Sequence, residues 1–193
     1  METIRALIAQ SQGDTEAILP HIETARQHAQ SPDLTGLYDW LSGVALWEQG
    51  HSQQATDHVR AALRNPSVYN DPFGYSGISF FLSDYLNQMG RRQEALAICE
   101  RLMDELVDAD DNPMAHAAPM GGQAGSLHYE ADELDTAAYL LKTNLHLSEP
   151  MKLTQGLVLG RLYLALIDYA RDQKADAYRK LHDARHLAIT AGS

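Results

Sequence analysis

The sequence has little cysteine, few aromatic residues and a shortage of positive charge. Its 193 residues include one cysteine, Cys99, so no disulfide can form within the chain and cysteines alone cannot build a zinc site. A single cysteine is also typical of a reducing compartment, and we expect a cytoplasmic location. Because 15 Lys and Arg residues stand against 26 Asp and Glu residues, the formal net charge is −11, which opposes binding to nucleic acids and to anionic membranes.

Long hydrophobic runs are absent as well. The most apolar stretch, residues 156–167, contains Arg161 and is much shorter than the roughly 20 residues that a membrane-spanning helix needs. Residues 1–5 have neither the basic segment nor the apolar core of a signal peptide. With 45% hydrophobic residues, the chain is long enough to bury a sizeable core, so we expect it to fold without a membrane span.

A helix–turn–helix pattern recurs along the chain. In each copy, a turn residue follows the first helix, and five positions later comes a small or apolar residue of a second, amphipathic helix. The turn residues are Gly13, Gly50, Gly90, Asp132 and Asp172, separated by 37, 40, 42 and 40 positions. Prolines show a similar spacing, and residues before them such as Ser31, Asp71 and Asn112 are good helix N-caps. These prolines are Pro32, Pro72, Pro113 and Pro150. Both registers predict a repeat near 40 residues, with a helix beginning at each proline.

The repeat predicts helices throughout and requires no strand. We place the helices at residues 2–12, 15–30, 33–49, 52–65, 72–89, 92–108, 113–131, 134–148, 150–171 and 174–190. They pair into repeats near 1–30, 33–65, 72–108, 113–148 and 150–190. Because one helix pair cannot bury its apolar face alone, we expect about five antiparallel pairs to stack into a single all-α domain over residues 1–193. Its shape would be a right-handed superhelix with a concave inner wall.

Small residues recur where the two helices of each pair should cross. Gly43, Ser83, Gly125 and Ala165 each stand 12 positions before an alanine in the following helix, and a large side chain there would force the helices apart. The alanines are Ala55, Ala95, Ala137 and Ala177. This arrangement resembles the tetratricopeptide (TPR) repeat, although the period here exceeds the usual one of about 34 residues.

One motif is similar to that of a particular family. Residues Gly125–Ala137 (GSLHYEADELDTA) resemble a hairpin that recurs in the superhelical sensor region of MalT-like, LuxR-type ATP-dependent transcription regulators. Gln88–Leu96 and Arg161–Leu166 are similar to the neighbouring helix pairs, so the resemblance covers about residues 34–190. It implies a region that binds an inducer or a regulatory protein. The family's nucleotide-binding motif and basic DNA-reading helix do not occur in this sequence.

Metal-binding patterns are incomplete. His182 and His186 stand four residues apart on one predicted helix, but no Glu or Cys completes a zinc motif, so we expect a solvated helix face. The run of Asp108, Asp110 and Asn112 has the start of a calcium loop. Its sixth and twelfth positions are Pro113 and Pro119 instead of Gly and Glu, which predicts a solvated connection.

Catalytic patterns are equally weak. Residues 121–125 (GGQAG) lack the preceding strand of a phosphate-binding loop, and we favour close helix packing as the reason for their glycines. Cys99 lies on an apolar helical stripe, where a buried and unreactive thiol is expected. We therefore expect no enzyme, no cofactor and no bound metal.

The concave wall is the predicted binding surface, because the first helix of each pair should face inward. Its aromatic and polar side chains suit a small polar ligand or an extended peptide. The candidate residues are Trp40, Trp47, Phe80, Asp84, Asn87, Gln88, Ser126, Tyr129, Glu130 and Tyr169. Any one of them can instead be a core residue, since aromatic and apolar residues at helical spacing often pack inside.

Two kinds of function follow from the sequence. The first is an effector-sensing domain of a MalT-like LuxR-family regulator, binding a small-molecule effector, a peptide or a regulatory protein in the groove. The second is a generic TPR-like scaffold that recruits protein partners and has no small-molecule ligand. Neither involves direct contact with nucleic acid or a membrane.

Overall fold

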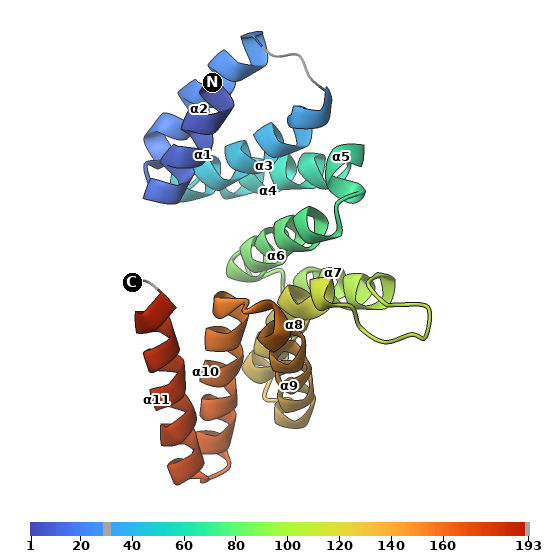
Figure 1. Ribbon diagram of the computed structural model, residues 1–193, viewed down its shortest axis with the longest axis vertical. Helices are drawn as coiled ribbons and strands as arrows, with labels where there is room; N and C mark the ends of the chain where they lie inside the picture. Colours follow the sequence, from blue (N-terminus) through green and yellow to red (C-terminus); the bar gives the residue numbers. More distant parts are fainter. Residues whose placement is uncertain (29–31, 192–193) are drawn as a thin grey trace. The chain divides into compact units, whose positions relative to one another are not determined.

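A computed structural model describes residues 1–28 and 32–191 of the chain (Figure 1). The helices are α1 (Glu2–Gln12), α2 (Thr15–His28), α3 (Pro32–Glu48), α4 (Ser52–Leu63), α5 (Pro66–Tyr69), α6 (Pro72–Gln88), α7 (Arg92–Glu105), the 3-10 turn η1 (Ala115–Ala117), α8 (Ala118–Glu130), α9 (Leu134–Met151), α10 (Thr154–Ala170) and α11 (Lys174–Ala191). Over the described ranges there is no β-strand; one isolated antiparallel bridge joins Val107 to Pro113. The predicted all-α class is confirmed.

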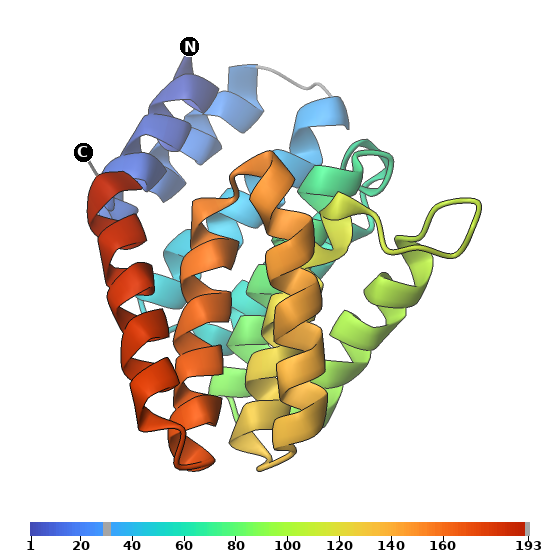
Figure 2. The same ribbon diagram turned by 60° about the horizontal axis from the view of Figure 1, so that its bottom comes forward.

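The chain divides into two compact units, Met1–Arg91 and Arg92–Ser193, which we call the N-terminal and C-terminal units. Helices α1 and α2 pair in the first unit, as do α3 and α4; in the second, α8 pairs with α9 and α10 with α11. Figure 2 shows α9, α10 and α11 lying side by side. The predicted repeat at 72–108 is shared between the units, and a single domain over residues 1–193 stays a prediction.

All five predicted turn residues end their helices in the same way. Each has a positive φ, between 60° and 82°, which is the left-handed region that glycine and, less readily, aspartate adopt. In each turn, the N–H of the following residue donates to the carbonyl five positions back, as His51 does to Leu46 at 2.8 Å and Gln173 to Asp168 at 2.8 Å. This Schellman motif satisfies carbonyls at the helix end and sends the chain back in the antiparallel direction.

Two of the four predicted small residues, Gly43 and Gly125, lie at helix crossings. A Cβ on Gly43 would stand 2.6 Å from Val59 Cγ2 and 3.0 Å from the Ala55 carbonyl oxygen. A Cβ on Gly125 would stand 2.7 Å from Leu141 Cγ. The distances of 2.6 Å and 2.7 Å are too short for a Cβ atom. Helices α3 and α4 therefore pack closely because Gly43 has no side chain, and α8 and α9 do so because Gly125 has none.

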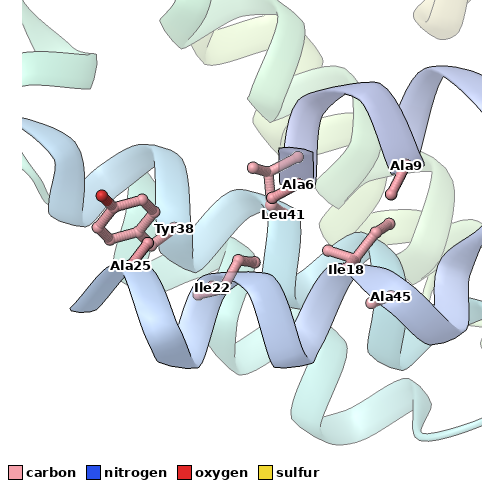
Figure 3. Packing of buried hydrophobic residues seen from close by; sticks show 8 residues of the cluster. All are labelled: Ala6, Ala9, Ile18, Ile22, Ala25, Tyr38, Leu41 and Ala45. Atoms are coloured by element: carbon pink, nitrogen blue, oxygen red, sulfur yellow. The ribbon is translucent and has the colours of Figure 1, made fainter. Parts of the chain in front are cut away.

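Each unit has its own apolar core. In the N-terminal unit, side chains from α1, α2 and α3 interlock (Figure 3); they are Ala6, Ala9, Ile18, Ile22, Ala25, Tyr38, Leu41 and Ala45. In the C-terminal unit, α9 and α10 contribute Ala137, Ala138, Leu141, Leu164 and Ile167. Cys99 of α7 is fully buried, as its position on an apolar stripe predicts.

A polar side chain, Asn144 of α9, lies inside the C-terminal unit. It is 1% exposed, and its Nδ2 donates to the Ala118 carbonyl at 2.7 Å. A Cβ on Gly122 of α8 would come within 2.9 Å of Asn144 Nδ2, and one on Gly160 of α10 within 2.9 Å of Asn144 Oδ1. The glycines of α8 therefore make room for packing, which agrees with the packing interpretation of residues 121–125.

Two of the predicted proline starts are wrong. Pro113 forms the bridge to Val107, and α8 begins only at Ala118. The reason is that the backbone N–H of Asn112 donates to Asp108 Oδ1, so Asn112 belongs to a closed loop and does not cap a helix. Pro150 lies in the last turn of α9, and Lys152 in the left-handed region ends that helix before α10 begins. Glutamate at position 149 is a poor cap, so the proline rule does not apply there.

The remaining helix bounds differ modestly from the prediction. Pro72 does begin a helix, and Asp71 Oδ1 accepts from Phe73 N at 3.2 Å as its cap. Helix α5 was not predicted, and α7 ends at Glu105 instead of near residue 108. Ser31 and the last two residues of the helix placed at 15–30 lie outside the described residues.

The acidic loop at 108–112 is a hydrogen-bonded turn. Asp108 Oδ1 accepts from the backbone N–H groups of Asn112 and Asp110, both at 2.9 Å. These bonds, first that from Asn112, lower the pKa of the Asp108 carboxyl. The carboxylate thus organises its own loop, in line with the solvated connection that the sequence predicts.

A matched pair of substitutions tests the crossing at Gly43. We expect Gly43→Ala to lower the free energy of unfolding by about 1–3 kcal/mol, because the new methyl group overpacks the α3–α4 contact. Gly77→Ala in α6, where a Cβ would meet nothing within 4 Å, should leave stability unchanged or raise it by up to about 1 kcal/mol. Urea unfolding followed by circular dichroism measures both, and equal midpoints for the two variants would contradict the close crossing.

Candidate functional site

A hollow of about 350 Å³ opens in the N-terminal unit between α3, α5 and α6. Its lining is mostly apolar. The residues are Leu34, Leu37, Trp40, Ser67, Val68, Asp71, Gly74, Gly77, Ile78 and Phe81. All of them belong to one unit, so the hollow is a property of that unit alone.

The short helix α5 forms one side of the hollow. This helix exists because two helix N-caps, Asn65 and Asp71, follow each other closely in the chain. Asn65 Oδ1 accepts from Ser67 N at 3.0 Å with Pro66 at the start of α5, and Asp71 then caps α6 in the same manner. Asn and Asp before proline favour this geometry, since the proline needs no hydrogen-bond acceptor for its nitrogen. The chain therefore makes one extra helical turn between α4 and α6 instead of passing directly between them.

Glycines let α5 and α6 approach their neighbours and leave space beside them. A Cβ on Gly36 of α3 would stand 2.6 Å from Val68 Cγ2, which shows how closely α5 packs on α3. Gly77 of α6 has no atom within 4 Å of its Cβ position, so the wall of the hollow is open at this point.

Trp40 contributes the largest ring of the lining. Its indole lies 5.8 Å from the ring centre of Phe81, at an angle of 56°. The Trp40 Nε1 atom is buried and donates no hydrogen bond to any described residue. Burying an unpaired donor costs about 1–3 kcal/mol, so an acceptor brought by a ligand would be favourable here.

The other polar groups of the lining are already engaged. Ser67 Oγ donates to Asn65 Oδ1 at 2.7 Å, and Asp71 Oδ1 accepts from Phe73 N. Asp71 is exposed and carries a formal negative charge at the edge of the hollow. The site thus offers an apolar surface and one carboxylate, and the buried N–H of Trp40 belongs to one of its lining residues.

The predicted candidates of the N-terminal unit lie on α3 and α6, and only Trp40 lines the hollow. Trp47 is half-buried and stacks on Tyr85, with ring centres 3.9 Å apart and 1° between the planes. Phe80 packs edge-on against Phe81 at 6.0 Å. Gln88 donates to Asp84 Oδ2 at 2.7 Å, and Asn87 is half-buried on the same helix.

The remaining candidates belong to the C-terminal unit. Ser126 is 6% exposed, and its hydroxyl donates to the Gln123 carbonyl of the same helix, so this side chain is buried and already has a partner. Tyr129 packs edge-on against Tyr163 at 5.5 Å. Glu130 is exposed, and Tyr169 is 54% exposed. A ligand site formed by all ten candidates stays a prediction.

Sequence reasoning missed most of the lining, including Phe81, Ile78, Val68 and Asp71. The sequence analysis selected Phe80 on α6, whereas the neighbouring Phe81 lines the hollow. A signal was present in the two Asx–Pro pairs at 65–66 and 71–72, which mark two helix starts only six residues apart.

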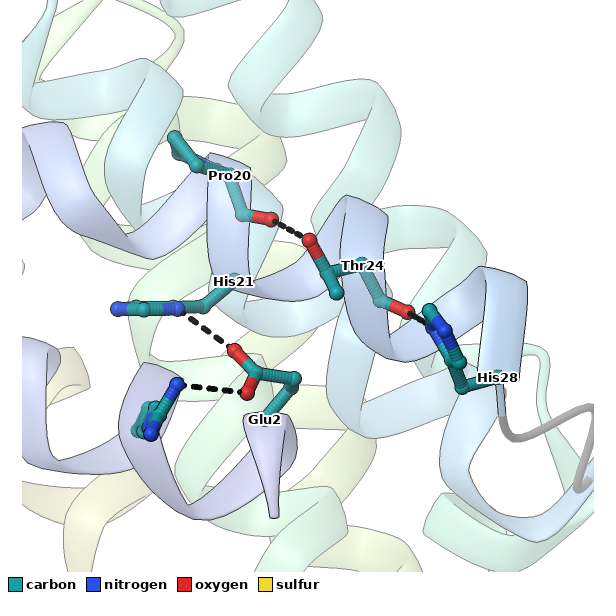
Figure 4. Close-up of polar contacts among 6 residues, drawn as sticks. Glu2, Pro20, His21, Thr24 and His28 are labelled. Carbon is teal, nitrogen blue, oxygen red and sulfur yellow. Dashed lines mark hydrogen bonds and ion pairs between the residues drawn. The ribbon is translucent and has the colours of Figure 1, made fainter.

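A second hollow, of about 330 Å³, lies against α1 and α2, and Met1, Glu2, Thr3, Thr24, Ala25 and His28 line it. Polar groups there are bonded to one another (Figure 4). Glu2 accepts from His21 Nδ1 at 2.9 Å and pairs with Arg5 at 2.8 Å; His28 Nδ1 lies 2.8 Å from the Thr24 carbonyl. Since these groups already have partners, this hollow is the weaker candidate for binding.

No group of three or more His, Cys, Asp or Glu side chains is placed to hold a metal ion within residues 1–28 and 32–191. Among the helices described, none combines the length and apolar character needed to cross a membrane.

Comparison with known proteins gives the fold. No protein-family model matches the chain, and no curated protein matches its sequence. BtubC from P. vanneervenii is 17% identical over 100% of this chain and 80% of its own, with a TM-score of 0.71. MamA from Desulfovibrio magneticus RS-1 is 16% identical over 100% and 96%, with a TM-score of 0.60.

A third similar structure is that of a Rap protein complexed with Competence and Sporulation Factor. It is 13% identical over 96% of this chain, with a TM-score of 0.75, and the chain spans 53% of its length. This chain has a TPR-like helical-repeat fold. At these identities the likeness concerns the fold alone, and none of the comparisons connects the chain with MalT-like regulators.

The Trp47–Tyr85 stack gives a test of the structure beside the hollow. Burial, followed by the charges of Glu48 and Asp84, raises the pKa of the Tyr85 phenol above its ordinary value. The folded chain then holds this proton more tightly than the unfolded chain, which ionises near pH 10. Stability is full below about pH 10 and falls as the pH rises further, because the unfolded state loses its proton first.

Urea unfolding at about pH 9 and about pH 11 checks this expectation. Tyr85→Phe should lose less stability than the unsubstituted chain over this interval, whereas Tyr139→Phe, with a ring that is 70% exposed, should follow the unsubstituted chain. Identical pH dependence for all three proteins would show that the Tyr85 hydroxyl is not buried against the stack.

Proposed function

We propose that the chain is a protein-interaction scaffold and that the hollow between α3, α5 and α6 binds a peptide segment of a partner. The observation that carries this proposal is an apolar hollow lined by Trp40, whose buried indole N–H has no hydrogen-bond partner among the described residues. In the bound state, a large apolar side chain of the segment fills the hollow and one of its backbone carbonyls accepts from Trp40 Nε1. Binding needs no chemical step, and we propose no enzymatic activity.

The chemistry of the lining favours a peptide over a small polar effector. A sugar or similar metabolite needs several hydrogen-bond partners, because its polar groups lose water on binding. Ser67 Oγ and Asp71 Oδ1 are already engaged within the unit, which leaves few such partners. A volume of about 350 Å³ lies at the small end of ligand sites, and it suits one or two side chains of a longer segment.

Charge indicates what flanks the apolar side chain. The chain has a formal net charge of −11, and the exposed carboxylate of Asp71 lines the hollow. Such a surface attracts positively charged partners and accelerates their association. We therefore propose a segment in which Lys or Arg stands next to a Leu or an aromatic residue.

The fold supports an interaction role. TPR-like proteins are built of stacked helix pairs with extended surfaces, and the similar Rap structure was solved with a second molecule, Competence and Sporulation Factor. Because this chain spans about half of that protein and shares 13% identity with it, the transfer of a binding role is our proposal. A cytoplasmic location, suggested by the single cysteine, is part of the same proposal.

The finer alternative is the sensor region of a MalT-like regulator. The resemblance of Gly125–Ala137 to that family's hairpin favours it, and a small-molecule inducer would then be the ligand. A metabolite panel added to the same titrations distinguishes the two, because a peptide-binding scaffold responds to peptides alone.

Peptide titration tests the proposal. The probes are short synthetic peptides with Leu, Phe or Trp beside Lys or Arg, and matched peptides in which Asp or Glu replaces the basic residue. We expect basic peptides to bind and to change the fluorescence of Trp40 in a Trp47→Phe background, while acidic peptides bind at least about tenfold more weakly. Gly77→Leu should abolish binding because its side chain enters the hollow, and it should leave the helical circular dichroism unchanged.

Two tryptophan variants form the matched control. Trp40→Phe keeps an aromatic ring and removes the N–H, so binding should weaken about tenfold, the usual effect of one hydrogen bond. Trp47→Phe changes the same helix outside the hollow and should bind as the unsubstituted chain does. Peptide binding that ignores Gly77→Leu and Trp40→Phe would contradict the proposed site.

A further inference from the structure

The carboxylate of Asp71, at the edge of the hollow, has one oxygen atom that the fold does not use. Its Oδ1 atom accepts from Phe73 N at 3.2 Å and caps α6. Among the described residues, Asp71 has no ion-pair partner, and its Oδ2 atom accepts no hydrogen bond. Because an ionised carboxylate offers about four acceptor positions, the group keeps room for donors that a partner brings.

Glycine at position 74 keeps this oxygen atom clear. A Cβ on Gly74 would stand 2.6 Å from Asp71 Oδ2, and the three atoms nearest to that position all belong to the Asp71 side chain. Gly74 and Asp71 both line the hollow. Any side chain at position 74 would therefore displace the carboxylate, and its absence leaves the Oδ2 atom beside the hollow.

An exposed aromatic ring stands near the same carboxylate. Tyr69 of α5 is 59% exposed, and its ring is held edge-to-face against Tyr75, with ring centres 5.1 Å apart. Since Tyr69 and Asp71 are two residues apart, their Cα atoms are at most about 7.6 Å from each other, a span that one long side chain covers. Phe73, two residues after Asp71, is 47% exposed as well. Rings gathered at the rim of an apolar hollow are typical of an interaction surface.

We propose that Asp71 and Tyr69 form a subsite for an arginine side chain, next to the apolar side chain that fills the hollow. The subsite rests on the peptide site of the proposed function and narrows its basic residue to arginine. In the bound state, the guanidinium donates to the Asp71 carboxylate and lies on the exposed ring of Tyr69. Arginine suits both contacts better than lysine, because its planar group forks onto a carboxylate and stacks on an aromatic face. The lysine ammonium is a compact and strongly hydrated charge.

Calorimetric titration of the full chain with three synthetic peptides tests the subsite. The peptides share a leucine and differ only in the neighbouring residue, which is arginine, lysine or citrulline. Citrulline keeps the planar shape of arginine and lacks its charge. We expect the arginine peptide to bind at least about fivefold more tightly than the lysine peptide and about tenfold more tightly than the citrulline peptide.

Two charge-removing variants show whether Asp71 causes this difference. Asp71→Asn removes the charge and keeps the helix cap, because asparagine caps helices as well as aspartate does. In this variant the arginine and citrulline peptides should bind equally. Glu23→Gln is the matched control, since Glu23 is exposed on α2, outside the lining of the hollow. It loses the same charge and should keep the full difference between the two peptides.

Two tyrosine variants test the stacking contact. Tyr69→Leu keeps an apolar side chain and loses the ring face, so it should weaken binding of the arginine peptide about threefold. Tyr139→Leu removes another exposed ring, which is 70% exposed in the C-terminal unit, and should leave that binding unchanged.

Circular dichroism confirms that the variants are folded, and Asp71→Ser, another uncharged cap, replaces Asp71→Asn if the latter is not. Equal binding of the arginine and lysine peptides would overturn the arginine subsite. The same result follows if citrulline weakens binding as much in Asp71→Asn as in the unsubstituted chain. In both cases the proposed function stands if Gly77→Leu still abolishes binding, whereas both proposals are wrong if none of the peptides binds.

Discussion

The left-handed residue at the end of each first helix is the constraint on which the fold depends. Gly13, Gly50, Gly90, Asp132 and Asp172 share this backbone conformation and the same 6→1 hydrogen bond across the turn. The motif fixes the length of the connection and the direction of the second helix. Where both helices belong to one unit, as α3 and α4 or α8 and α9 do, the second helix lies on the first, and the close crossings follow from that contact.

Close contact then determines which residues are permitted at the crossings. Gly43 and Gly125 have no room for a side chain, and their partners Val59 and Leu141 fill the space that a Cβ would occupy. Packing is equally close around Asn144, because Gly122 and Gly160 have no room for a side chain beside it. The Asn144 side chain also donates a hydrogen bond to the backbone of α8. Since tight pairs bury little apolar surface by themselves, each pair depends on its neighbours for a core.

The proposed binding site arises from a departure from this regular scheme. The hollow exists because two Asx–Pro caps insert α5 before α6, which leaves Trp40 and Phe81 beside an open space. Regular repeats therefore supply stability, while the interruption at α5 offers a surface for a partner.

The sequence by itself determined the helical class, the period near 40 residues, all five turn residues and the role of glycine at the crossings. These features depend on local geometry, since a left-handed turn or a helix crossing constrains a single position strongly. It did not determine where α8 and α10 begin, because Asn112 and Glu149 precede prolines without capping a helix, and hydrogen bonds to Asp108 decide the course of the first of these loops. Nor did it select Phe81 over Phe80 or reveal that Ser126 is buried. Adjacent positions on a helix differ by about 100° in direction, so the residues that face a hollow are decided by the helices packed around them, and only the tertiary structure contains that information.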